Sequence, residues 1–340
     1  MFILLSASFS CDLLTGPRGD VQPGRRDYVW TVDALPPSIF LTECIWGYSA
    51  SDVWLGAYGA NSLFHYDGNK WEVWNGAPSN HSEVDAIYGF GPNDAWLVTY
   101  NNEIWHFDGN KWSRSFVYAP TNSPYVFIQS ISGNSPSDVY AVGTIGANDS
   151  LGGFILHNDG SGWKEAYRAN FFSAFVRTKV ENGTVYVLSA DTPVNEPKPV
   201  VSFYAFRGGI LKKIYSGFIY NTGLSDVGGK VYFMISGDIC RYVLGNFQKV
   251  FSIAGSNFAY NVYGRSEKDV FVSMYDGLAH WNGTDVQYVS KFPNTPYVGS
   301  VAVFPNDVFA VSHDMSTGKN MVHHGKLIGE DYTAKTKTIK

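Results

Sequence analysis

Residues 87–112 read IYGFGPNDAWLVTYNNEIWHFDGNKW, and this stretch decides the fold because it recurs along the chain. Residues 45–71 read IWGYSASDVWLGAYGANSLFHYDGNKW, and residues 131–163 read ISGNSPSDVYAVGTIGANDSLGGFILHNDGSGW. All three share Ile-x-Gly, a turn, Asp followed by an apolar and an aromatic residue, then His-x-Asp-Gly and a Trp. Self-similarity at a nearly constant spacing predicts a repeat architecture.

The repeat continues into the C-terminal part of the chain. Residues 262–283 and 300–325 keep most of the frame, whereas two middle segments, 180–211 and 228–247, keep only its skeleton. One aromatic residue marks the second strand of every unit, and successive positions are 38 to 46 residues apart. These aromatic residues are Trp54, Trp96, Tyr140, Tyr186, Tyr232, Phe271 and Phe309. The spacing therefore predicts seven units.

Each unit contains four short runs of β-type sequence and no helical period. The second run is rich in β-branched and aromatic residues, and Asp-Gly-Asn at residues 67–69 and 108–110 predicts tight hairpins because Gly accepts a positive φ. Four antiparallel strands recurring at this spacing are typical of a β-propeller blade. We therefore predict an all-β, seven-bladed β-propeller over residues 27–330. An N-terminal strand at residues 28–32 is expected to complete the last blade and close the ring.

Composition excludes several other classes. Charged residues make up 16% of the 340 residues and aromatic residues another 16%, which argues against a coiled coil and against global disorder. The net charge of −5 disfavours an electropositive nucleic-acid-binding protein, so we expect no nucleic-acid partner. The sequence contains no run of 18 apolar residues, so no internal transmembrane helix is predicted.

The N-terminal residues resemble a bacterial lipoprotein signal. Residues 1–10 read MFILLSASFS, an apolar run that ends in small residues just before Cys11. We predict a signal peptide over residues 1–11 with lipidation of Cys11, a Gly/Pro-rich flexible tether over residues 12–26 and a basic tail over residues 331–340. The protein would then be exported and anchored in the bacterial cell envelope, at the outer membrane or in the periplasm. The alternative is that the first residues form an ordinary buried strand.

The repeat frame itself resembles a known group of proteins. Ile-x-Gly, Ser-x-x-Asp-Val-Trp and His-Tyr-Asp-Gly-x-x-Trp are similar to the repeats of kelch-like and BNR-like propeller lipoproteins of bacterial envelopes. The resemblance covers residues 45–325, clearly in five units and weakly in two. It implies the fold and no catalytic residues. A sialidase-type Asp-box would read Ser-x-Asp-x-Gly-x-Thr-Trp, which this frame does not match.

The histidines and cysteines are interpreted as structural. We assign one His to the same position of the third strand in five units. A residue that recurs at the same position from blade to blade is expected to stabilise the blade itself. The five are His65, His106, His157, His280 and His323, while His81, His313 and His324 are placed on loops or an edge. The distant thiols Cys44 and Cys240 match no metal-ligand spacing. We therefore expect no metal site and no cofactor.

Binding residues are sought where the units differ. In a propeller, the loops between blades and the loops between second and third strands gather on one face, where ligands are commonly bound. These loops are rich in Tyr, Phe, Asn, Ser and Pro, which suits a neutral protein or glycan partner. The predicted ligand-binding residues are Tyr118, Tyr125, Phe127, Gln129 and Tyr260. We expect a monomeric, non-catalytic binding protein.

Two alternatives stay open. Glu43 and Asp85 stand two residues before the Ile of neighbouring units, and two carboxylates at a channel mouth are suited to general acid–base chemistry. The first alternative is therefore a glycan-active hydrolase or lyase that uses Glu43 and Asp85. The second is a purely structural envelope protein.

Overall fold

The computed structural model describes the chain from residue 22 to residue 329 with internal gaps. Every regular element in the described residues is a β-strand, and 28 strands are found. The prediction of an all-β chain is therefore confirmed. The described residues are 22–35, 42–59, 61–76, 78, 83–121, 123, 125–147, 150–191, 200–218, 222–255, 257–292, 298–314 and 316–329.

After β1, the strands follow one another in six groups of four and a last group of three, each group corresponding to one sequence unit. The first half contains β1 (Tyr28–Ala34), β2 (Thr42–Ser49), β3 (Asp52–Ala57), β4 (Leu63–Tyr66), β5 (Trp71–Val73), β6 (Val84–Gly91), β7 (Asp94–Thr99), β8 (Glu103–Phe107), β9 (Trp112–Val117), β10 (Tyr125–Ser135), β11 (Asp138–Ala147), β12 (Ser150–Asn158), β13 (Trp163–Arg168) and β14 (Ala174–Glu181). The second half contains β15 (Thr184–Asp191), β16 (Val200–Arg207), β17 (Ile210–Phe218), β18 (Thr222–Val227), β19 (Lys230–Ile235), β20 (Asp238–Val243), β21 (Asn246–Ser252), β22 (Phe258–Ser266), β23 (Asp269–Met274), β24 (Gly277–Trp281), β25 (Val286–Lys291), β26 (Val298–Val303), β27 (Asp307–Asp314) and β28 (Lys319–Leu327).

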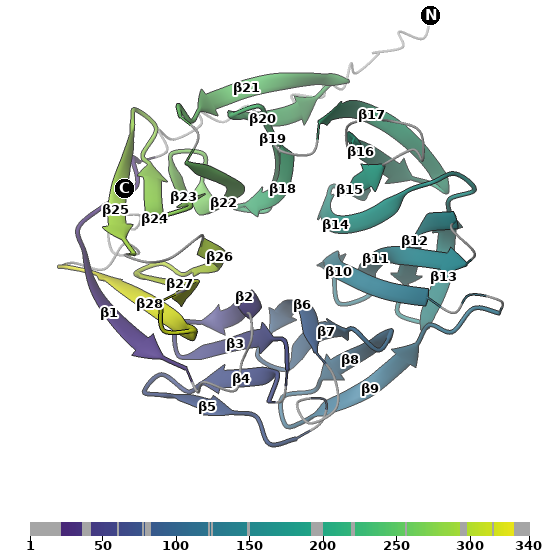
Figure 1. The fold of residues 1–340 in the computed structure, drawn as a ribbon, viewed down its shortest axis with the longest axis horizontal. Helices are drawn as coiled ribbons and strands as arrows, with labels where there is room; N and C mark the ends of the chain where they lie inside the picture. The colour runs from purple at the N-terminus through teal and green to yellow at the C-terminus, as the bar shows by residue number, and fades with distance from the viewer. Residues whose placement is uncertain are drawn as a thin grey trace, which may run out of the picture.

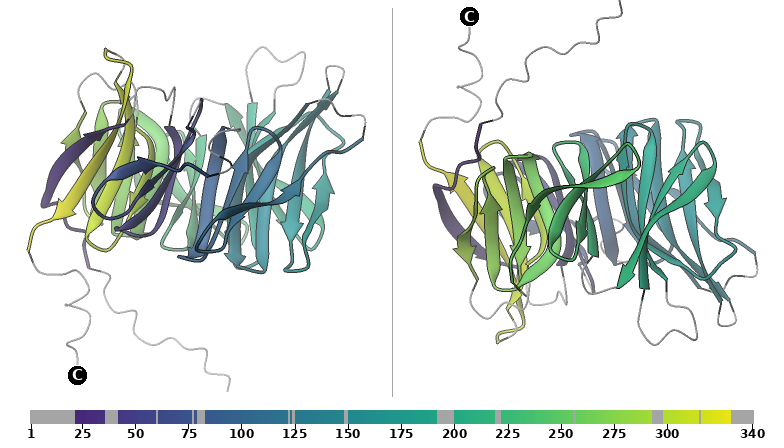
Figure 2. Two further views of the ribbon diagram at one scale, coloured as in Figure 1. Left: turned by 90° about the horizontal axis from the view of Figure 1, so that it is seen from below. Right: turned by 90° about the horizontal axis from the view of Figure 1, so that it is seen from above.

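The sheets stand around a common centre like the blades of a propeller (Figure 1). Five sheets have four strands, and the sixth has eight because β18 meets β22 in a single parallel pair, Val227 with Gly264. The first strand of each group lies at the centre and the fourth at the periphery (Figure 1). In side view the molecule is a disc whose strands run between its two faces (Figure 2).

The first strand of the chain pairs with the last. β1 lies antiparallel to β28 over seven residue pairs, from Tyr28 opposite Leu327 to Ala34 opposite Met321. The resulting sheet has the order β1-β28-β27-β26, so β1 covers the outer edge of β28. Figure 1 shows this strand in purple beside the yellow β28 at the periphery. An uncovered edge would expose unpaired N–H and C=O groups.

The core of the described residues is divided into seven apolar clusters, each between neighbouring groups of strands. Trp54 of β3, for example, packs edge-on against Phe107 of β8 and Trp112 of β9, with ring centroids 5.1 and 5.4 Å apart. Phe309 of β27 packs against Tyr66 of β4 at 5.4 Å, which joins the last group to the first. Burying each such side chain contributes about 1.5–3 kcal/mol.

The glycine of the Ile-x-Gly motif is explained by contacts between groups. A Cβ atom on Gly89 would lie 2.5 Å from a ring carbon of Trp46, the middle residue of the preceding motif. A Cβ on Gly47 would likewise lie 2.8 Å from the ring of Phe304 in the last group. Only glycine leaves room for these rings, so the motif sets how closely the inner strands approach one another.

The repeated Asp and His residues form a pair in five groups. The distance from His Nε2 to Asp Oδ1 is 2.7–2.8 Å, and each His ring packs on the second-strand aromatic ring at 4.0–4.7 Å. The pairs are Asp52–His65, Asp94–His106, Asp138–His157, Asp269–His280 and Asp307–His324. The pairing ties the start of the second strand to the third strand in each of these groups.

One histidine assignment from the sequence was wrong. His324, not His323, occupies the repeated position, because the register of β27 and β28 places Phe309 opposite His324. His323 points to the other face of the strand, as alternation requires. There it is buried, stacked on Phe292 at 3.6 Å and 2.7 Å from the hydroxyl of Ser312.

The segment before β1 covers one of the Asp–His pairs. Gly24 N donates to Lys268 O at 2.8 Å, and Arg26 donates to His280 O at 2.9 Å and pairs with Asp285 at 2.8 Å. Asp269 and His280 are fully buried, whereas the side chains of the other four pairs are 13–33% exposed. These contacts place residues 22–26, which we had assigned to the tether, on the propeller.

The first prediction concerns Gly24. A Cβ atom there would lie 2.4 Å from Asp269 Oδ1 and 2.6 Å from the ring of His280, so Gly24→Ala should displace the segment and lower the melting temperature. Gly91→Ala is the matched control, because a Cβ at Gly91 meets nothing within 4 Å. Thermal unfolding followed by circular dichroism measures both. Equal melting temperatures for the two variants would show that the segment does not pack here.

The second prediction concerns stability against pH. Burial lowers the pKa of His323 from 6.5 to about 4, so the folded protein keeps this ring neutral while the unfolded chain binds a proton. Stability should therefore fall as the pH drops from 6.5 towards 4, by about 3 kcal/mol from this residue. His323→Gln should flatten that part of the curve measured by urea unfolding. Part of the pH dependence should remain in the variant, because burial also lowers the pKa of His280. A wild-type slope in the variant contradicts the assignment.

Candidate functional site

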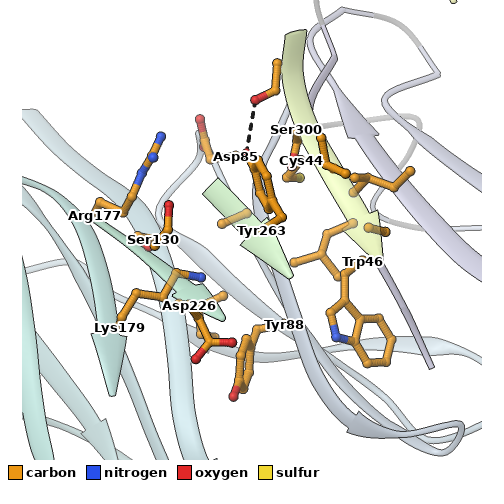
Figure 3. Close-up of a pocket in the computed structure, with 18 of the residues that line it drawn as sticks. Cys44, Trp46, Asp85, Tyr88, Ser130, Arg177, Lys179, Asp226, Tyr263 and Ser300 are labelled. Atoms are coloured by element: carbon orange, nitrogen blue, oxygen red, sulfur yellow. Dashed lines mark hydrogen bonds between the residues drawn. The ribbon is translucent and has the colours of Figure 1, made fainter. Parts of the chain in front are cut away.

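A cavity of about 570 Å³ lies at the centre of the ring, lined by the first strands of all the groups (Figure 3). Most of these strands contribute small or apolar residues to it, including Ile45, Ile131 and Val301. Charged side chains come from three strands only among the described lining residues: Asp85 of β6, Arg177 and Lys179 of β14, and Asp226 of β18. The charged side chains of the cavity are therefore confined to β6, β14 and β18 among the described lining residues.

Arg177 and Lys179 lie two residues apart on β14 and point to the same side, as strand alternation requires (Figure 3). One amino group of Arg177 donates to Asn261 Oδ1 on β22. Lys179 makes no hydrogen bond and no ion pair with any residue in the described part of the chain. Asp226 stands on the adjacent β18 (Figure 3), where it accepts a backbone hydrogen bond from Gly229.

Burial in the cavity changes the titration of these groups. Burial lowers the pKa of Lys179, and the adjacent charge of Arg177 lowers it further, while Asp226 opposes the shift. Burial raises the pKa of Asp226, with Lys179 opposing. Lys179 and Asp226 are partly buried, and a charge partly withdrawn from water interacts more strongly with a ligand of opposite sign than a fully exposed charge does.

Of the two carboxylates predicted for catalysis, only Asp85 is placed. Asp85 lines the cavity and accepts a hydrogen bond from the hydroxyl of Tyr58 at 3.0 Å. The side chain of Glu43 lies outside the described residues. Asp85 is therefore the one member of the predicted pair that the structure brings to the cavity.

The predicted ligand-binding residues divide into three environments. Gln129 lines the central cavity, where its side-chain carbonyl accepts from Thr144 at 3.2 Å. Tyr260 is partly buried against Phe258, with ring centroids 4.7 Å apart, and is not among the cavity-lining residues of the described chain. Tyr125 is 61% exposed.

Phe127 and Tyr118 complete the set. Phe127 is partly buried beside Tyr100 at 5.1 Å. The expectation that Tyr118 lies exposed was wrong, because only 6% of it is accessible. Its hydroxyl donates to Glu165 and accepts from Arg168 at 3.0 Å, and these bonds satisfy its polar end in the buried position.

Most of the exposed aromatic side chains of the described residues lie on one face of the disc, whereas Tyr48 lies at the opposite face, near the end of β2. The side chains on the first face lie in, or at the strand ends next to, the connections between second and third strands or between successive groups, which topology places at the same end of the sheets. We call this set the aromatic rim; it comprises the exposed Tyr100, Tyr125, Phe171, Phe218 and Tyr275, together with the partly buried Phe127 beside Tyr100. A smaller cavity of about 280 Å³ adjoins Phe171.

Four rim residues were not singled out from the sequence. A signal existed for two of them, because Tyr100 directly follows β7 and Tyr275 directly follows β23. Tyr58 holds the same place after β3. Alignment of the units on their second strands would have shown a tyrosine repeated at this position, exposed at Tyr100 and Tyr275 and partly buried at Tyr58. Phe171 and Phe218 have no such repeat and depend on the fold for their assignment.

The described residues lack both a metal-binding cluster and a membrane-spanning helix. They contain no group of three or more His, Cys, Asp or Glu side chains arranged to hold a metal ion. They also contain no helix long and apolar enough to cross a membrane.

Comparisons with known proteins establish the fold. No protein-family model and no curated protein sequence matches the chain. Virginiamycin B lyase from Staphylococcus aureus is similar in structure, with a TM-score of 0.64 at 11% identity, covering 88% of this chain and 100% of that one. YCF48 bound to D1 peptide has a TM-score of 0.60 at 16% identity, covering 91% and 100%. The Pan2 WD40 domain from Neurospora crassa has a TM-score of 0.58 at 10% identity, covering 92% and 99%.

The third prediction contrasts a buried and an exposed tyrosine. Tyr118→Phe removes a hydroxyl that bonds Glu165 and Arg168, so the free energy of unfolding should fall by about 1 kcal/mol. Tyr125→Phe is the control, because its ring lies largely in solvent and should change stability by less than about 0.5 kcal/mol. Urea unfolding measures both, and an equal effect at the two positions contradicts the assigned environments.

All these neighbours are β-propellers, and at such low identity they show the fold alone. The described chain is all-β, has four-stranded antiparallel sheets and superposes on these proteins over most of its length. The protein is therefore a β-propeller.

Proposed function

We propose that the propeller has seven blades and that β1 closes the ring. The 28 strands fit seven groups of four, and the seven apolar clusters fall between successive groups. The pairing of β1 with β28 supplies the fourth strand of the last group. On this proposal the eight-stranded sheet is two blades joined by the contact of Val227 with Gly264.

We propose that the protein is a non-catalytic binding module that takes a protein segment or a glycan on the face carrying the aromatic rim. The observation that carries this proposal is that most of the exposed Tyr and Phe side chains lie at loops and adjoining strand ends on one face of the disc. Rigid aromatic side chains supply large contact areas at low entropic cost. YCF48, one of the structural neighbours, has been solved with a bound D1 peptide, which is consistent with peptide binding by this fold.

A glycan-active hydrolase or lyase is the second candidate function. The observation that favours it is Asp85, a carboxylate in the central cavity. Asp85→Asn separates the two proposals, because it would abolish turnover by an enzyme and leave binding at the aromatic rim unchanged.

We propose further that the protein is an exported monomer held in the bacterial envelope by a lipid on Cys11, without a nucleic-acid partner. The support is the sequence of residues 1–11 together with the net charge of −5, and Cys11 lies outside the described residues. The kelch-like and BNR-like lipoproteins that the repeats resemble occupy the same compartment.

The fourth prediction tests the binding face. A displayed peptide library should enrich ligands for the purified domain, and Tyr125→Ala should weaken the enriched ligand by about tenfold or more because an exposed aromatic anchor is removed. Ile210→Ala is the control, since Ile210 is 72% exposed at the start of β17, on the opposite face. A glycan array run in parallel decides between the two ligand classes. Ligands weakened only by Ile210→Ala would contradict the proposal.

The fifth prediction tests the anchor. Cys11→Ala should release the protein from membranes into the soluble fraction, and globomycin should block maturation of the wild type. Fractionation followed by immunoblotting measures the release. Unchanged membrane retention of the Cys11→Ala protein would rule the lipid anchor out.

A further inference from the structure

The side chains of Arg177 and Lys179 in the central cavity carry more N–H donors than the surrounding residues accept. A guanidinium carries five N–H donors and a lysine ammonium three. Arg177 donates one hydrogen bond, to Asn261, and Lys179 donates none to any described residue. Arg177 and Lys179 lie on one strand and line the same cavity, so their unused donors face a common space (Figure 3).

The carboxylates in the cavity do not use these donors. No oxygen of Asp226 lies within 4.0 Å of the Lys179 ammonium, and a backbone N–H of Gly229 bonds the Asp226 carboxylate. Asp85 accepts from the hydroxyl of Tyr58. A partly buried cation without a close acceptor costs free energy, so the arrangement suits an acceptor supplied from outside the chain.

The repeat shows that the fold does not need these cations. Arg177 stands where other inner strands carry Cys44, Ala86 and Ser130, and Lys179 stands where they carry Trp46 and Tyr88. The other inner strands form the ring with these smaller or aromatic residues. Arg177 and Lys179 therefore place charges at two positions of the repeat where other inner strands carry uncharged residues.

We propose that the central cavity is a binding site for a carboxylate, held between Arg177 and Lys179. The volume of about 570 Å³ is that of a small-molecule site. The planar fork of an arginine matches a carboxylate. Asp85 and Asp226 balance the two cations, which favours a singly charged carboxylate over a doubly charged phosphate. The carboxylate belongs either to a free small molecule or to an acidic side chain of a bound protein.

The test is a chemical-shift titration of the isotope-labelled protein with matched probes. N-acetylglycine carries one free carboxylate, and N-acetylglycinamide is its uncharged control. A short peptide with blocked ends and one Glu, compared with its Gln analogue, represents the side chain of a protein partner. Binding of N-acetylglycine assigns the site to small molecules, and binding of the Glu peptide alone assigns it to a protein side chain.

The variants test whether the cavity residues are responsible. Lys179→Met should weaken carboxylate binding by about tenfold or more, as expected for the loss of a hydrogen bond to a charged group. Lys212→Met is the matched control, because Lys212 is an exposed lysine on the peripheral strand β17. If Lys179→Met lowers the melting temperature, the double variant Lys179→Met with Asp226→Asn keeps the balance of charge and carries the test.

The outcomes are separate from those for the aromatic rim. Tyr125→Ala should leave N-acetylglycine binding unchanged, so failure of the rim proposal leaves this site intact. The proposal is overturned if neither carboxylate probe binds, if each binds no better than its uncharged control, or if Lys179→Met leaves the affinity of the probe unchanged.

Discussion

The structure depends on the pairing of the first strand of the chain with the last. Without β1, the outer edge of β28 would present unpaired backbone groups, and the last group would have three strands. Two further contacts join the same ends of the chain. The ring of Phe304 fills the space above Gly47, and the segment at Gly24 and Arg26 covers the buried pair of Asp269 and His280. The N-terminal part of the described chain is therefore joined to the C-terminal groups by backbone pairing, side-chain packing and hydrogen bonding together.

The circular arrangement of the groups brings together inner strands that are far apart in the sequence, and these strands line the central cavity. The fold is maintained by features that recur: the Ile-x-Gly spacing, the Asp–His pair and the aromatic ring beneath it. Positions that do not contribute to these recurring features can vary without loss of the fold, and a binding function can arise there. Arg177, Lys179 and the exposed tyrosines after the second strands are departures or additions of this kind.

The sequence predicted the strands, their grouping and the partner of β28 because each follows from local pattern. It did not predict that the repeated Asp bonds the repeated His, since that depends on the register between two strands. The doublet at His323 and His324 was assigned wrongly for the same reason. Tyr118 was misplaced because a tyrosine next to a loop is buried or exposed according to its neighbours in space, and its partner Glu165 is 47 residues away. The cations on β14 went unnoticed because the repeat is weakest there.

The register of β1 on β28 is tested most directly by a disulfide between Ala34→Cys and Met321→Cys. These residues lie opposite each other, and Leu35 donates to Asn320 at the next position, which makes Ala34 and Met321 a closely spaced, non-hydrogen-bonded pair. The fraction of cross-linked chain after mild oxidation is measured by mass spectrometry in a protein lacking Cys11. The account predicts nearly complete cross-linking within the monomer and a higher melting temperature than either single variant. Failure to cross-link, or cross-linking only between molecules, would contradict closure of the ring by β1.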